Sequence, residues 1–201
     1  MPKKKFAFKA RRQRVAEEPT VARANISAAP MAASAPQANK LVISGEPGSA
    51  IRMGDADVRG KDVEISGLNS CRVELAGQPN AFHIRGLVDC TVLIGPVSRS
   101  LLISDCTRCR FWIACQQLRV HTTTDTEFYL HVTSKAIIED CTNVRFAPYS
   151  WNYAGIDADY AASGLNRGRN AWNQVDDFKW LNPNAPSPNW RVLAEDERAA
   201  P

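Results

Sequence analysis

One sequence pattern recurs three times in this chain at a fixed spacing. The copies read VEISGLNSCRVEL from Val63, FHIRGLVDCTVLI from Phe82 and LLISDCTRCRFWI from Leu101, so the pattern repeats with a period of 19. A cysteine stands at the same place in each copy: Cys71, Cys90 and Cys109. A fixed period of about 20 residues with short apolar runs is typical of a solenoid, in which each coil buries its apolar face only against the next.

Each repeat holds apolar runs of three to five residues separated by Gly, Asp, Asn or Pro, which is the pattern of short strands. At about 3.3 Å per residue, one period is long enough for one triangular turn of three such strands, and the next turn stacks about 4.8 Å away in parallel. The sequence therefore predicts an all-β parallel β-helix. An up-and-down barrel or a sandwich is the alternative, but neither explains cysteines that recur at the period of the repeat.

The register of the later turns is less regular. A further step of 19 from Leu101 reaches Val120, and AIIEDCTNVRF from Ala136 repeats LLISDCTRCRF at an offset of 35. This predicts that the period shortens to about 16 in the coil after Val120. On this register Arg119 aligns with the small residues Ser100 and Ala81. Lys135 then falls on the row of Arg119, and Glu139 on the row of Thr123.

The chain divides into three parts. Residues 1–39 are basic and then rich in Ala and Pro, which predicts a disordered tail and linker. Residues 40–193 are predicted to form the β-helix domain. Its last part, from residue 151, is expected to be mostly irregular, with a short helix in NAWNQVDDFKWL, and to pack on the coils. Residues 194–201 are expected to be disordered.

Charge is concentrated at one end. Residues 1–14 hold seven Lys or Arg and no acid, which leaves 18 basic and 21 acidic residues elsewhere. The domain itself is thus slightly acidic. The basic tail is either a solvated arm or a segment that binds nucleic acid, an anionic membrane or an acidic protein, and for the protein as a whole we expect no nucleic-acid partner. No apolar run approaches the roughly 18 residues that a membrane span needs, and Pro2 excludes myristoylation at this start. We therefore expect a cytoplasmic protein without a lipid anchor.

Metal and nucleophile motifs are weak. The six cysteines contain one C-x-x-C, and Val144 replaces the Cys109 position in the later repeat, so an internal ladder of free thiols is favoured over zinc or a disulfide. The three histidines share no metal-ligand spacing. GEPGSAIRMG lacks the ending of a phosphate loop, and no nucleophile motif is present. No metal and no cofactor of its own is expected.

The stretch ACQQLRVHT, residues 114–122, raises a separate question. On a strand, Leu118 and Val120 face one way while Arg119 and His121 face the other. The earlier repeats have small residues at this position, so the arginine is not part of the packing of the repeat. It is either a surface residue paired with a carboxylate such as Glu139, or an arginine presented to a phosphate or carboxylate of a partner.

Four motifs together resemble one family. ACQQLRVHT, SKAIIEDCTNVRFAPY, DDFKWL and SPNW, spread over roughly residues 40–193, are similar to the tubulin-binding cofactor C domain, whose relatives include the X-linked retinitis pigmentosa protein and the cyclase-associated proteins. The resemblance implies a right-handed parallel β-helix that activates GTP hydrolysis in a partner. It implies that Arg119 is the arginine finger. It further implies a partner- or nucleotide-facing surface formed by Gln116, Gln117, His121, Glu139, Phe146 and Tyr149.

The resemblance also implies partners. The first is β-tubulin, held with cofactors D and E, and the substrate is then GTP bound to that partner. The alternatives are an Arf-like small GTPase and a non-catalytic, actin-type binding module. The chain would supply a catalytic arginine in trans and has no complete active site of its own. The family's usual N-terminal helical bundle is not recognisable in this sequence.

Overall fold

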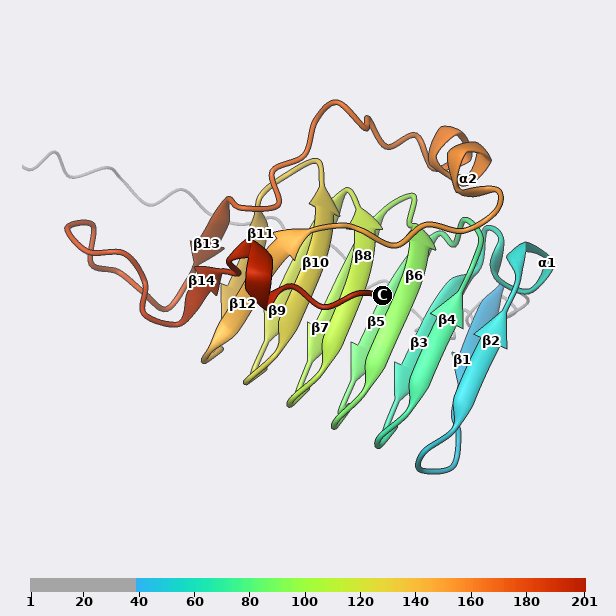
Figure 1. The fold of residues 1–201 in the computed structure, drawn as a ribbon, viewed down its shortest axis with the longest axis horizontal. Coiled ribbons are helices and arrows are strands. Elements are labelled where there is room, and N and C mark those ends of the chain that lie inside the picture. The colour runs from blue at the N-terminus through green and yellow to red at the C-terminus, as the bar shows by residue number, and fades with distance from the viewer. Residues whose placement is uncertain (1–38) are drawn as a thin grey trace, which may run out of the picture. The chain divides into compact units, whose positions relative to one another are not determined.

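The computed structural model describes residues 39–201, and its strands form two parallel sheets (Figure 1). One sheet has the order β1-β3-β5-β7-β9-β11-β13 and the other β14-β12-β10-β8-β6-β4-β2. The first sheet contains β1 (Lys40–Ile43), β3 (Asp62–Ser66), β5 (Ala81–Arg85), β7 (Ser100–Ser104), β9 (Gln117–His121), β11 (Ala136–Glu139) and β13 (Val175–Asp177). The second contains β2 (Ala50–Met53), β4 (Arg72–Leu75), β6 (Thr91–Pro96), β8 (Arg110–Cys115), β10 (Glu127–Val132), β12 (Val144–Pro148) and β14 (Trp190–Val192).

The chain therefore winds as a parallel β-solenoid, as predicted, because consecutive strands alternate between the two sheets and each pairs in parallel with the strand one turn later. A barrel or sandwich of antiparallel strands is excluded. The predicted third strand of each turn is reduced to one bridging residue, in the column Asn69, Val88, Thr107, Thr124 and Thr142.

The pairing corrects the predicted register. Phe82 pairs with Leu101 and Leu101 with Leu118, so the step along the chain falls from 19 to 17 on entering β9. The step into β11 is 18, since Val120 pairs with Ile138. Most of the shortening therefore precedes β9 instead of following it, so β9 shifts by two residues, whereas the predicted offset of 35 between Leu101 and Ala136 is confirmed.

Two columns of left-handed residues turn the chain between the sheets. One column lies at the ends of the strands of the first sheet: Gly67, Gly86, Asp105, Thr122 and Asp140. The other lies three residues further on: Ser70, Asp89, Arg108, Asp125 and Asn143. Gly, Asn and Asp tolerate positive φ best, which is why these residue types punctuate the repeat. Thr122, at φ 46°, is the one β-branched residue in these two columns.

The core lies between the sheets and is built in columns. Cys71, Cys90 and Cys109 form one column, which Thr126 and Val144 continue, and all six cysteines are free and buried. The predicted ladder of thiols is thus confirmed. A second column stacks Phe111 on Phe128 and Phe128 on Phe146, with ring centroids 5.3 and 5.5 Å apart.

The C-terminal segment extends the solenoid and covers it. β13 and β14 add a strand to each sheet, and Trp190 packs edge-on against Phe146 at 5.9 Å. The prediction of a short helix in NAWNQVDDFKWL is wrong, because that segment holds β13. The helices among residues 39–201 are instead α1 (Asp55–Val58), α2 (Ile156–Ser163), which packs on Ala114, and the 3₁₀ turn η1 (Glu195–Glu197).

Residues 194–201 are ordered, contrary to the prediction. Their chain crosses the outer face of the second sheet (Figure 1), where the Ala199 amide donates to the Tyr129 hydroxyl at 2.7 Å and Glu197 pairs with Arg191. The predicted disordered tail lies almost wholly outside the described residues. No helix in the described part of the chain is long and apolar enough to cross a bilayer.

Candidate functional site

Arg119 stands on the outer face of the first sheet. Along β9, Leu118 and Val120 are buried while Gln117, Arg119 and His121 are exposed, which confirms the predicted alternation. Its neighbours on the same row are Leu102 and Ile137, not the small residues that the sequence register suggested. A rung paired on both sides holds the Cα of this arginine rigidly while the guanidinium remains in solvent.

The guanidinium of Arg119 has no ion pair or hydrogen bond with any residue between 39 and 201. The pairing with Glu139 considered from the sequence is absent. Glu139 aligns with His121 and not with Thr123, and its carboxylate contacts the Lys179 ammonium at 3.6 Å. No side chain among residues 39–201 therefore competes with a partner for Arg119.

A hollow of about 310 Å³ opens beside Arg119. Its lining includes Gln117, Lys135, Ile137 and Asp176, and the Lys135 ammonium donates to the Asp176 carboxylate at 3.0 Å. The hollow thus combines the apolar Leu118 and Ile137 with polar and charged side chains, a lining that can accept a charged group brought in from outside.

Gln116 lies at the corner between β8 and β9 and is exposed. Its backbone is fixed on both sides, because its amide donates to the Arg99 carbonyl at 3.1 Å and its carbonyl accepts from the Ser134 hydroxyl at 2.7 Å. Its side chain has no hydrogen-bond partner within the described part of the chain. Gln116 and Gln117 thus lead directly into the Arg119 rung.

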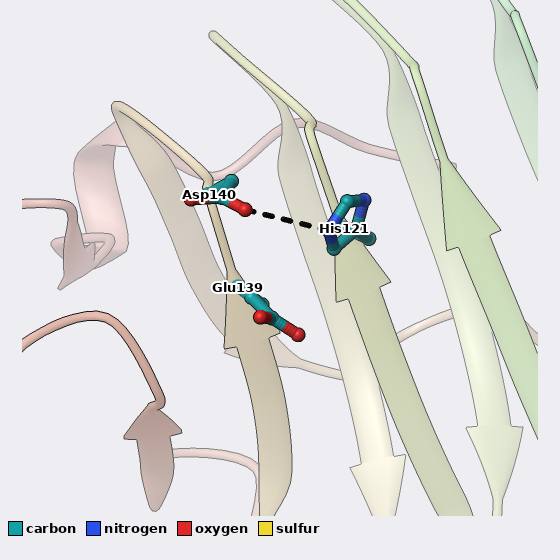
Figure 2. Close-up of side chains that lie close together, drawn as sticks. All are labelled: His121, Glu139 and Asp140. Carbon is teal, nitrogen blue, oxygen red and sulfur yellow. Dashed lines mark ion pairs between the residues drawn. The ribbon is translucent and has the colours of Figure 1, made fainter.

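His121, Glu139 and Asp140 gather at the end of this face (Figure 2). The His121 Nε2 lies 3.4 Å from Asp140 Oδ2, and the Thr122 hydroxyl lies 2.6 Å from His121 Nδ1. One ligand atom from each of the three lies within 4.8 Å of the others, the spacing of a potential metal site. However, the Lys179 ammonium lies 3.6 Å from Glu139 and 3.5 Å from Asp140 and compensates their charge. The geometry therefore favours an ion network centred on lysine.

The position of Lys179 is set by Asp177, at the end of β13. The Asp177 carboxylate accepts from the Ser187 hydroxyl at 2.6 Å, the Asn189 amide at 2.8 Å and the Lys179 backbone amide at 3.1 Å. Burial alone would raise the pKa of Asp177, but these hydrogen bonds outweigh it and lower the pKa below its usual range. One carboxylate thus ties the DDFKWL and SPNW motifs together beside the site.

Two predicted surface residues are elsewhere. Phe146 is fully buried in the core column between Phe128 and Trp190. Tyr149 follows β12 of the second sheet, its hydroxyl donates to the Ile94 carbonyl at 3.1 Å, and burial raises the pKa of its phenol. The prediction that both border the Arg119 surface is wrong, because Phe146 lies on β12 of the opposite sheet and Tyr149 directly follows that strand.

Sequence reasoning missed the roles of Asp140 and Lys179. Asp140 was visible only as a neighbour of Glu139, and it reaches this face because the chain turns there with a positive φ of 52°. Lys179 lies far along the chain from Glu139, inside the DDFKWL motif. The motif marked the segment, but no sequence signal paired its lysine with these acids.

The family model for tubulin binding cofactor C matches residues 60–178, more than half of the chain, including Arg119, His121, Glu139 and Asp140. The chain belongs to the tubulin binding cofactor C family. Tubulin-specific chaperone C of Mus musculus is 44% identical over 210 residues, which cover 98% of this chain and 60% of that protein. Tubulin-folding cofactor C of Arabidopsis thaliana is 46% identical over 136 residues, 68% of this chain and 39% of that protein.

The chain is also similar to a more distant relative and to a solved structure. Protein XRP2 of Mus musculus is 34% identical over 84 residues, 42% of this chain and 23% of that protein. The structure of tubulin binding cofactor C from Leishmania major superposes with a TM-score of 0.58 at 26% identity, covering 80% of this chain and 93% of that one. The chain thus spans less than two thirds of the length of the mouse and plant proteins that it matches.

Proposed function

We propose that this chain is a tubulin-folding cofactor of the C type, which stimulates GTP hydrolysis by β-tubulin held with cofactors D and E. Arg119 enters the partner's nucleotide site as an arginine finger, and the resulting hydrolysis releases the assembled tubulin heterodimer. The observation that carries the proposal is an exposed arginine, without an ion pair to any residue in the described part of the chain, on a rigid rung of a cofactor C solenoid. Such a role places the protein in the cytoplasm, where tubulin is assembled.

The chemistry suits an arginine. Negative charge spreads over the transferred phosphoryl oxygens in the transition state of GTP hydrolysis, and a guanidinium can donate two parallel hydrogen bonds to them. An arginine supplied in trans is worth roughly 10³–10⁵ in rate in GTPase–activator pairs. The finger must be placed closely, and a rung paired with β7 and β11 provides that rigidity.

The surrounding residues have supporting roles in this proposal. Gln116 and Gln117 carry amide groups that can bind the partner's phosphate or backbone beside the finger. His121 and Glu139 form the rim of the same face and contact the partner protein.

The test is GTP hydrolysis by tubulin with cofactors D and E, stimulated by the full chain or by its Arg119→Ala variant. The matched control is Arg85→Ala, since Arg85 is also exposed on the outer face of the first sheet. We expect the Arg119 variant to lose at least about 100-fold of the stimulated rate and the Arg85 variant to retain it. Equal stimulation by the Arg119 variant would remove this residue from catalysis.

If the wild-type chain does not stimulate tubulin at all, the same assay is repeated with an Arf-like GTPase, using the wild type, Arg119→Ala and Arg85→Ala. Binding to either GTPase, or to actin, without any change in hydrolysis would instead identify a non-catalytic module.

A further inference from the structure

Three carboxylates lie within reach of Arg119. Ile137 is the direct strand partner of Arg119, and Glu139 stands two residues beyond it. The Cα atoms of Arg119 and Glu139 are therefore diagonal neighbours about 8 Å apart. Asp140 follows Glu139, and Asp176 lies on the Arg119 row two strands away, at about 10 Å. Long side chains bridge such separations, so an unpaired arginine here is not the default outcome.

Each of these carboxylates is already held by another cation. The Lys179 ammonium contacts both Glu139 and Asp140, and the His121 imidazole approaches the same Asp140 oxygen (Figure 2). The Lys135 ammonium holds Asp176 at 3.0 Å. Arg119 is left without a carboxylate in the described part of the chain because its competitors are closer to each acid.

Lys179 is the cation that comes from outside the repeat. It follows β13, and its backbone amide is fixed by the Asp177 carboxylate, which also ties down Ser187 and Asn189. The C-terminal segment thus delivers one ammonium to two of the three acids within reach of the proposed finger. Its placement does not depend on the partner.

We propose that Lys179 is a positioning residue that keeps Arg119 free by holding Glu139 and Asp140. This rests on the proposed function of Arg119 as the finger. Without Lys179, the two carboxylates would attract the guanidinium, and it would have to leave them before it could enter the partner's site. An exposed pair of this kind is weak and salt-sensitive, so its formation would slow activation by about two- to fivefold at low salt.

The test uses the full chain with Lys179→Met, the conservative Lys179→Arg, and Lys40→Met as the matched control. Lys40 pairs with Glu64 on the same face but at the first rung, far along the sheet from Arg119. The first readout is the Nε–Hε resonance of Arg119, assigned by its loss in Arg119→Ala. We expect it to shift in Lys179→Met, to return when Glu139→Gln and Asp140→Asn are added, and to be unchanged in the other two variants.

The second readout is stimulated GTP hydrolysis at two ionic strengths. We expect the two- to fivefold defect of Lys179→Met to fade at high salt and to be absent in Lys179→Arg. A purely structural defect would be neither removed by salt nor rescued by the arginine. An unmoved Arg119 resonance, or a defect that is independent of salt, would overturn the proposal. Because the resonance is measured on the protein alone, it decides the role of Lys179 even if Arg119→Ala shows that the finger assignment is wrong.

Discussion

Replacing Asp177 by alanine removes the anchor between β13 and the loop that returns to β14. The wild-type carboxylate accepts three hydrogen bonds, from the Ser187 hydroxyl, the Asn189 amide and the Lys179 backbone amide. Hydrogen bonds to a charged acceptor contribute about 1.5–3 kcal/mol each when buried. Asp177 is only partly buried and water can replace some of them, so we expect the variant to lose about 2–3 kcal/mol of unfolding free energy in all.

The loss should depend on pH in a defined direction. The pKa of Asp177 is lowered in the folded protein, so its contribution is fully present above the unfolded pKa of about 3.9 and is lost as the pH falls below that value. Urea unfolding at neutral pH and at several values below pH 4 measures this. The stability gap between the wild type and Asp177→Ala should be constant at neutral pH and should shrink in acid.

Two variants serve as controls. Asp176→Ala breaks only the exposed pair with Lys135 and should cost less than about 1 kcal/mol. Asp177→Asn keeps an acceptor oxygen without the charge, so its loss of unfolding free energy should lie between those of Asp176→Ala and Asp177→Ala. The reasoning fails if Asp177→Ala costs no more than Asp176→Ala, or if its stability gap does not change in acid.

Substitutions at three further positions test the register and the turns. Arg119→Ala should change the unfolding free energy by less than about 0.5 kcal/mol, because the side chain is exposed and makes no ion pair within the described residues; a large drop in a thermal melt would contradict its placement. Cys90→Asp should cost about 4 kcal/mol or more by burying an unpaired charge, while Cys90→Val should cost less than about 1.5 kcal/mol; similar denaturation midpoints for both would be evidence against the thiol column. Thr122→Asn should raise stability by about 0.5–1 kcal/mol, because asparagine tolerates a φ of 46° better than a β-branched residue; an unchanged urea midpoint would refute strain at this turn.

The fold was predictable because the repeat recurs at a regular spacing in consecutive coils. Cys71, Cys90 and Cys109 recur with a period of 19, and only a stacked solenoid places them in one column. The outward display of Arg119 was also predictable, since alternation along a strand fixes which face each residue occupies.

The register was not predictable, and the reason is physical. A slip of two residues preserves the alternation, so the apolar pattern fits Leu118 or Val120 equally well opposite Leu101. Backbone pairing selects Leu118. The same slip moves Glu139 from the row of Thr123 to the row of His121, and that decides which charges meet at the site.

The sequence alone determined the repeat, the inward and outward faces of each strand and the family motifs, because all three depend on short, regular spacing along the chain. Only the tertiary structure decided that Phe146 belongs to the core, that Lys179 holds Glu139 and Asp140, and that Arg119 therefore has no ion pair with residues 39–201. These contacts join segments that are distant in the sequence, and their distances depend on how the turns stack and how the C-terminal segment returns across them.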